Sequence, residues 1–196
     1  TFGNVTKYIM MGTSSNFGNM FSMAGGTLFL PFLPMLPIQI LLNNFLYDLS
    51  EIAIPLDEVD EDTLARPRVW DMDFIRSFML ALGPVSSVFD FLTFYVMLAV
   101  FQANEALFHT GWFIESIATQ VLVIFIIRTR GNPFANRPNN WLVVLSLAVV
   151  AVAALLPWLP FAGELGFVAP PLAFYAVVAG IVAAYLAAMY WAKQVF

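Results

Sequence analysis

Six long apolar stretches, separated by short polar or proline-containing segments, dominate the hydrophobic pattern of the chain. An α-helix needs about 20 mostly apolar residues to cross the hydrocarbon core of a bilayer. We therefore predict membrane-spanning helices at residues 8–31, 36–54, 74–101, 112–127, 141–159 and 171–191. The pattern is typical of an all-α membrane protein built as a six-helix transmembrane bundle.

The composition supports a membrane protein and argues against the soluble classes. Of the 196 residues, 61% are apolar and 11% are charged, whereas soluble domains contain about 45–50% apolar and about 25% charged residues. So little polar surface cannot coat a globule in water, which excludes an ordinary soluble enzyme or a nucleic-acid binder. With no Cys and the single His109, we expect neither disulfides nor a His- or Cys-rich metal site.

The positive charges indicate an orientation. All eight Lys and Arg residues fall on one side of the six predicted helices, which a missed or extra helix would not allow. Cytoplasmic loops carry an excess of Lys and Arg, so this side and both chain ends are predicted to be cytoplasmic. Residues 55–73, with a run of Asp and Glu, are interpreted as a solvated cytosolic loop. The eight cations are Lys7, Arg66, Arg68, Arg76, Arg128, Arg130, Arg137 and Lys193.

The densest polar residues inside the predicted spans suggest an ion site. Asn16 and Asn19 are three residues apart, and Asn44 and Asp48 are four apart, so each pair shares one helical face. Counted at about 1.5 Å per residue from the proline-rich turn, the two faces overlap in depth. Amide and carboxylate oxygens suit Mg²⁺ or Ca²⁺, and Mg²⁺ usually keeps several of its waters. These four residues are therefore predicted ion ligands.

Four further polar residues leave alternatives open. Glu115 could be a ligand, a proton relay or a capped structural acid, and we include it in the candidate set. Asp90 is interpreted as structural, since Ser86 and Ser87 offer nearby partners, and Asn43 as a residue that joins helices by hydrogen bonds. Glu51, near the cytoplasmic mouth, is expected to be solvated.

Small and aromatic residues predict how the spans pack and end. Four glycines in the first span favour close helix approach, and three prolines force a tight turn before the second span. Tyr8 and four of the five tryptophans lie near the ends of the predicted spans. They are expected at the membrane interface as anchors. The residues concerned are Gly12, Gly18, Gly25, Gly26, Pro31, Pro34, Pro37, Trp112, Trp141, Trp158 and Trp191.

An ordered series of motifs resembles one family. Lys7-Tyr8-Ile9, then Ser14 to Asn19, the proline-rich turn and Asn43-Asn44-Phe45-Leu46-Tyr47-Asp48 resemble the fifth and sixth spans of P-type ATPases. Ala53 to Asp57 and Arg66 to Trp70 are similar to the loop after the sixth span. Gly83 to Asp90, Ser116 to Gln120 and Ile127 to Arg130 look like the bacterial magnesium-transporting members. The resemblance covers essentially all 196 residues.

The resemblance implies that the chain is a fragment of a ten-span pump, its fifth to tenth spans. Such a pump moves Mg²⁺ into the cytoplasm by ATP hydrolysis through a phosphoaspartate, in the bacterial inner membrane. The fragment lacks the first four spans and the actuator, phosphorylation and nucleotide domains, so it is not catalytic alone. Its partners are those missing parts of the polypeptide, coupled through residues 55–73, and membrane lipid. The family's ion-binding positions match Asn16, Asn19, Asn44 and Asp48, and Glu115 is similar in placement to an acidic ligand of calcium pumps.

Two other interpretations stay open at this point. One is a P-type pump for another cation, such as calcium or protons. The family's calcium pumps have an acid at the position of Asn19 and a Thr at that of Tyr47, so the smaller charge here favours a single divalent ion. The other is a free-standing six-span channel or scaffold. The chain begins at Thr1 without an initiator Met, from which we expect a piece of a longer protein.

Overall fold

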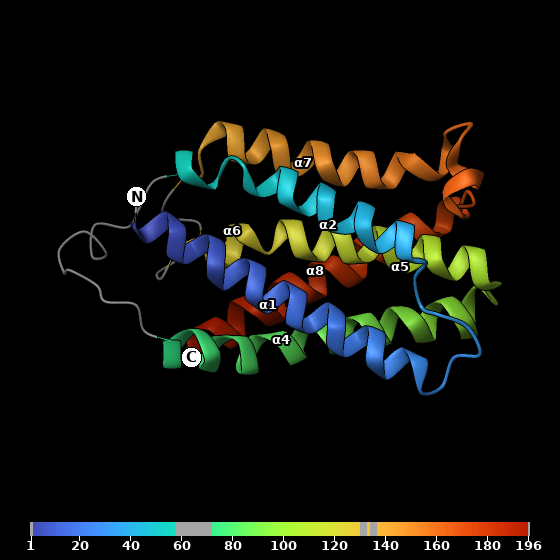
Figure 1. Ribbon diagram of the computed structural model, residues 1–196, viewed down its shortest axis with the longest axis horizontal. Helices are drawn as coiled ribbons and strands as arrows, with labels where there is room; N and C mark the ends of the chain where they lie inside the picture. Colours follow the sequence, from blue (N-terminus) through green and yellow to red (C-terminus); the bar gives the residue numbers. More distant parts are fainter. Residues whose placement is uncertain (1, 58–71, 130–132, 134–136, 196) are drawn as a thin grey trace.

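The computed structural model describes residues 2–57, 72–129, 133 and 137–195. The regular structure of these residues is entirely helical, and six long helices run side by side along the molecule (Figure 1). They are α1 (Phe2–Thr27), α2 (Pro37–Glu51), α4 (Met72–Tyr95), α5 (Glu105–Leu122), α7 (Asn140–Leu155) and α8 (Leu172–Val195). The all-α bundle predicted from the sequence is confirmed.

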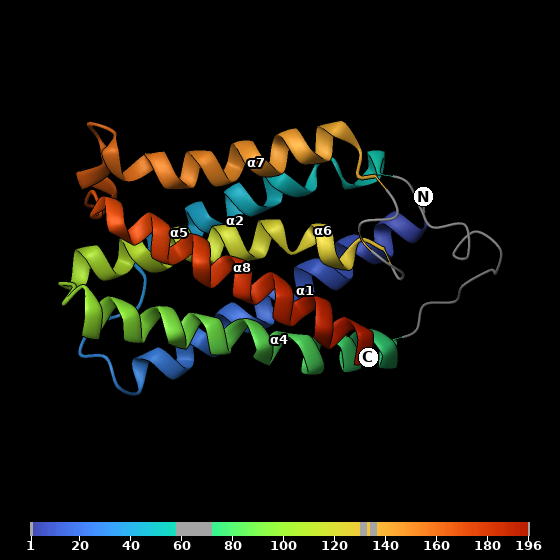
Figure 2. The same cartoon turned by 180° about the vertical axis from the view of Figure 1, so that it is seen from behind.

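Shorter helical segments extend or connect the long helices. A π-helical turn at Val96–Val100 continues α4, α6 (Ile124–Ile127) continues α5, and the 3₁₀ turn Leu156–Trp158 continues α7. Further 3₁₀ turns lie at Ile54–Leu56 and Ala162–Leu165. The start of α1 and the end of α8 lie at the same end of the bundle, as an even number of crossings requires (Figures 1 and 2).

Four of the six helices are long and apolar enough to cross a membrane, namely Met72–Val100, Glu105–Ile127, Asn140–Trp158 and Leu172–Gln194. The first two helices do not meet that standard by length and composition alone. Helix α2 has 15 residues, and α1 contains the polar run Ser14-Ser15-Asn16. Both nevertheless lie alongside the other four (Figure 1).

The helix that contains the predicted fourth span begins at Glu105, seven residues before Trp112. Asn104 caps this helix, because its side-chain oxygen accepts a hydrogen bond from the Leu107 backbone N–H at 2.9 Å. Trp112 consequently lies two turns inside α5 with 1% of its surface exposed, and it is no interfacial anchor.

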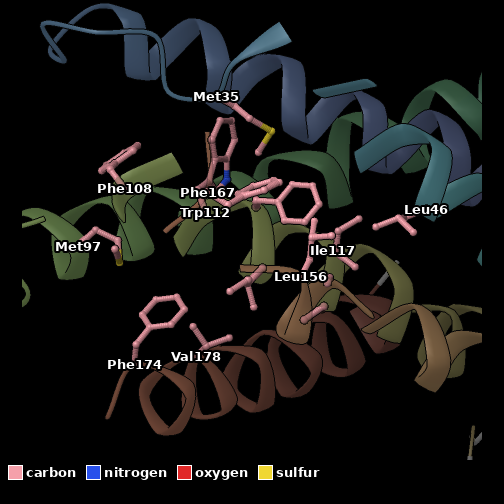
Figure 3. Packing of buried hydrophobic residues seen from close by; sticks show 14 of the residues in the cluster. Met35, Leu46, Met97, Phe108, Trp112, Ile117, Leu156, Phe167, Phe174 and Val178 are labelled. Carbon is pink, nitrogen blue, oxygen red and sulfur yellow. The ribbon is translucent and has the colours of Figure 1, made fainter. Parts of the chain in front are cut away.

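Helix α5 occupies the centre of the bundle. It packs against α2, α4, α7 and α8, while α1 packs chiefly along α4. Its aromatic side chains form the middle of the main hydrophobic cluster, and Figure 3 shows Phe174 and Val178 of α8 pointing toward them. The structure thereby encloses the polar residues of α5.

Glycines allow the close approach of α1 and α4. A Cβ at Gly18 would lie 3.1 Å from the Ser86 Cβ and 3.2 Å from the Gly83 carbonyl oxygen. A Cβ at Gly83 would lie 2.6 Å from the Phe17 ring. The expected packing role is confirmed for Gly18, whereas Gly12 has no neighbour within 4 Å.

Candidate ion-binding site

The structure brings three of the predicted ligands together in a cavity of about 480 Å³, here called the amide pocket. Asn16 and Asn19 come from α1 and Asn44 from α2. Because Asn16 and Asn44 are exposed and Asn19 is half-buried, the pocket opens at the outer face of α1 and α2. Its remaining lining consists of Met20, Met23, Ala24, Met35, Ile40, Asn43, Trp112 and Ser116.

A buried hydrogen-bond network supports the back of the amide pocket. Gln120 donates to Ser116, and also to the Asn43 Oδ1 at 3.3 Å. Asn43 donates to the Ser116 Oγ at 3.4 Å, and that hydroxyl donates to the Asn19 Oδ1 at 3.5 Å. Asn43 therefore joins α2 to α5, as predicted, and it also lines the pocket. The sequence analysis did not predict this network. The i, i+4 spacing of Ser116 and Gln120 is the sequence feature that could have indicated it.

Asp48 lines a different cavity, of about 440 Å³, here called the carboxylate pocket. It shares this pocket with Glu51, Asn4 and Tyr8. Asp48 is exposed and lies one turn from Asn44 on α2. Asn44 and Asp48 thus lie on the same face of α2 but line two successive cavities rather than one.

Glu51 is not solvated, contrary to expectation. Only 4% of its surface is exposed, and its carboxyl group interacts with the Tyr47 hydroxyl. The start of α1 is joined to the turn after α2 beside this pocket, because Asn4 donates hydrogen bonds to the Pro55 and Asp57 carbonyl oxygens at 3.1 and 3.0 Å. The carboxylate pocket therefore pairs one exposed and one buried acid.

Glu115 lies apart from the other four predicted ligands. It is fully buried and lines neither pocket. Its carboxyl group interacts with Asp90 of α4, whose partners also differ from those predicted. Asp90 accepts hydrogen bonds from the Ser22 Oγ at 2.5 Å and the Trp112 Nε1 at 2.9 Å. Ser87, expected to serve Asp90, donates instead to the Gly18 carbonyl oxygen at 3.1 Å.

The first part of the predicted cytosolic loop is fixed against the bundle. Asp57 has 1% of its side chain exposed and accepts hydrogen bonds from the Lys7 Nζ at 2.9 Å and the Asn139 backbone N–H at 3.1 Å. The Arg128 guanidinium lies 3.6 Å away. Asp57 thus ties α1 to the segments that follow α6 and precede α7, and it is not the solvated acid that we expected. Residues 58–71 of this loop lie outside the described residues.

The donor chemistry of the two pockets suits a hard cation. The amide pocket offers neutral oxygens, and six waters at about 30 Å³ each would fill roughly 180 Å³ of its volume, so a hydrated Mg²⁺ fits. Among the residues that the structure describes, no three His, Asp or Glu side chains gather to hold a metal.

Comparison of the amino-acid sequence with known proteins shows the family of the chain. Residues 32–195 match the family described as "Cation transporting ATPase, C-terminus". The chain belongs to this family. It is 43% identical over 191 residues to "Magnesium-transporting ATPase, P-type 1" of Escherichia coli strain K12, and 44% identical over 191 residues to the protein of that name from Salmonella typhimurium strain LT2.

The matches also fix which part of a cation-transporting ATPase this chain represents. Each alignment covers 95% of the chain and 21% of the relative. The chain therefore spans about a fifth of the length of these curated relatives, and corresponds to their C-terminal membrane region. The family resemblance drawn from the sequence motifs is confirmed.

Proposed function

We propose that this chain is the C-terminal membrane domain of an ATP-driven magnesium importer, and that the amide pocket and Asp48 form part of its ion path. The observation that carries the proposal is that Asn16, Asn19 and Asn44 line one pocket, while Asp48, one turn from Asn44 on α2, lines the next. The relatives are named as magnesium-transporting ATPases, which supports Mg²⁺ as the cargo.

The proposed ligand set contains four of the five predicted residues. The amides of Asn16, Asn19 and Asn44 would hold a hydrated ion, and the carboxylate of Asp48 would supply the charge that replaces part of the hydration shell. Glu115 is left out of this set because it is fully buried and lines neither pocket. The exposure of Asn16, Asn44 and Asp48 is consistent with further ligands from the first four spans.

The remaining parts of the pump are proposed from the family. ATP and its Mg²⁺ would bind on the phosphorylation and nucleotide domains, which act with the actuator domain through the segment that includes Asp57. The membrane is proposed to be the bacterial inner membrane. Both chain ends are proposed to be cytoplasmic, since Lys7, Arg128 and Lys193 gather at one end of the bundle and cytoplasmic sides carry an excess of Lys and Arg.

The test replaces Asp48 in the full-length pump that contains this chain. Asp48→Asn keeps the size of the side chain and removes its charge. We expect Mg²⁺ uptake into cells without other magnesium transporters to fall at least about tenfold, because loss of a metal-site contact commonly costs 10–100-fold. Uptake is followed with a fluorescent Mg²⁺ indicator.

Asp73→Asn is the matched control, since Asp73 is exposed at the start of α4 and lines neither pocket. It should transport at the normal rate. Normal uptake by a well-inserted Asp48→Asn protein would remove Asp48 from the ion path. A loss of calcium or proton transport instead of magnesium transport would change the proposed cargo.

A further inference from the structure

Two acids and the end of a helix concentrate negative charge around the carboxylate pocket. Asp48 and Glu51 lie in the last turn of α2, which contains no basic residue. The C-terminal end of a helix carries a partial negative charge and is stabilised by a cation nearby. The residues that line the pocket include no Lys, Arg or His. The negative charge of this turn therefore has no positive counterpart in the pocket wall.

Glu51 has a carboxylate oxygen without a partner among the described residues. Only 4% of its surface is exposed, and its Oε1 atom accepts no hydrogen bond from them. A buried carboxylate is costly unless it is paired with a positive group or coordinates a metal. Asp48, which lies one turn away on α2, is itself an acid and adds to the negative charge.

Asn4 brings a second unpartnered oxygen to the same pocket. Its amide nitrogen donates hydrogen bonds to the Pro55 and Asp57 carbonyl oxygens, and these two bonds use both amide hydrogens. They also fix the orientation of the amide, because the reversed group would place its oxygen against two carbonyl oxygens. The Oδ1 atom accepts no hydrogen bond from the described residues, and 7% of the Asn4 surface is exposed.

Asp57 shows how an acid at the same end of the bundle is matched by protein groups. Its carboxylate accepts hydrogen bonds from the Lys7 Nζ and the Asn139 backbone N–H, and the Arg128 guanidinium lies 3.6 Å away. Neither Lys7 nor Arg128 lines the carboxylate pocket. Asp57 is therefore a structural acid, whereas the Glu51 carboxylate keeps an oxygen for a ligand.

We propose that Glu51, Asp48 and the Asn4 amide oxygen bind a hydrated divalent cation, at a position here called the mouth site. The start of α1 and the end of α2 lie together at the end of the bundle that is proposed to be cytoplasmic (Figure 1). The mouth site is distinct from the amide pocket, and it rests on the proposed function because it is the last position of the transported ion before the cytoplasm.

The donors and the size of the pocket suit Mg²⁺. This ion is commonly bound through one or two carboxylates and keeps several of its waters. Six waters at about 30 Å³ each fill roughly 180 Å³, and the cavity has about 440 Å³. A water molecule alone would satisfy the Asn4 oxygen but would leave the charge of Glu51 and of the helix end unmatched.

The face of α2 connects the two cavities. Asn44, Asp48 and Glu51 are spaced by four and three residues, so they lie on one helical face. Asn44 lines the amide pocket, and the two acids line the carboxylate pocket. An ion that leaves the neutral amides thus meets first one carboxylate and then the other.

The test counts Mn²⁺ bound to the full-length pump without nucleotide, and measures free Mn²⁺ by electron paramagnetic resonance. Mn²⁺ is a suitable probe because it takes the same oxygen ligands as Mg²⁺. In Glu51→Gln we expect one Mn²⁺ ion to bind at least about tenfold more weakly, because loss of a metal-site contact commonly costs 10–100-fold. The matched control is Glu105→Gln, since the Glu105 side chain is 56% exposed and lines neither pocket. It should bind Mn²⁺ normally.

A second variant keeps the test decisive if Glu51→Gln does not insert. Val5 lines the pocket and is 45% exposed, so Val5→Lys adds a positive charge there without removing a buried group. It should weaken Mn²⁺ binding at least about tenfold, because like charges repel, whereas Val5→Gln should bind normally. Unchanged Mn²⁺ binding in an inserted Glu51→Gln or Val5→Lys protein would overturn the proposal.

Uptake measurements separate the mouth site from the rest of the ion path. In Glu51→Gln we expect the maximal rate of Mg²⁺ uptake to fall and the external Mg²⁺ concentration for half-maximal uptake to stay the same. The reason is that the ion reaches the mouth site only after the amide pocket, and a change in half-saturation instead would contradict this order. Loss of uptake in Asp48→Asn with normal Mn²⁺ binding in Glu51→Gln would refute the mouth site alone. Normal uptake in Asp48→Asn with weakened Mn²⁺ binding in Glu51→Gln would refute the proposed ion path alone.

Discussion

Helices α5 and α7 show opposite relations between composition and position. In its most apolar stretch, α5 with α6 is 83% buried within the bundle, although it contains His109, Glu115 and Gln120. The corresponding stretch of α7 is 33% buried, although most of that helix is Ala, Val and Leu. The helix with more polar residues is at the centre, and the more apolar helix is at the edge (Figures 1 and 2).

The physical basis of this contrast is the solvent around the helices. Lipid tails are as apolar as Leu, so burying an apolar side chain against another helix gains little over leaving it in lipid. A polar group in lipid lacks partners and is costly there, so it is placed in the bundle interior. Polar contacts and close packing, rather than apolarity, should therefore set the sensitivity of each helix to substitution.

The largest expected effect comes from removing a polar group at the centre. Asp90→Ala leaves the Ser22 hydroxyl and the Trp112 indole N–H without their acceptor. Each unsatisfied buried donor costs about 1–3 kcal/mol, so we expect unfolding to become easier by about 3 kcal/mol. Detergent-induced unfolding of the purified full-length protein measures this change. Asp73→Ala, at an exposed position, should be close to neutral, and equal losses in the two variants would contradict the comparison.

Close packing without polar contacts should give an intermediate effect. Gly18→Val adds a branched side chain where the Ser86 Cβ and the Gly83 carbonyl oxygen leave no room. Overpacking of this kind costs about 1–3 kcal/mol. Gly12→Val is the matched control on the same helix, since a Cβ at Gly12 meets nothing within 4 Å. The same unfolding assay should rank Gly18→Val well below Gly12→Val in stability.

The smallest effect is expected on the outer face of α7. Leu147 is 54% exposed, so Leu147→Ala removes contacts with lipid more than contacts with protein. We expect a change within about 0.5 kcal/mol, as for exposed substitutions in general. A loss as large as that of Asp90→Ala in the unfolding assay would show that α7 is held by apolar packing after all.

The errors made from the sequence share one cause. Trp112 was expected at the interface and Glu51 in water, and both are buried. Asp90 was paired with its neighbours in sequence, but its partners come from α1 and α5. For Trp112 and Asp90 the local pattern was read correctly as helical, whereas the hydrogen-bond partners lie more than twenty residues away on other helices.

The helical class, the six apolar stretches, the turn at Pro31 to Pro37 and the family could all be predicted from the amino-acid sequence. Length, apolarity and proline are local properties, and they suffice to specify where helices form. The packing of the helices was needed to show that Asn16, Asn19 and Asn44 share a pocket, that Asp48 lines the next one, and that Glu115 is buried apart from them. Those relations depend on how helices rotate and pack against one another, which is set by contacts between residues far apart in the chain.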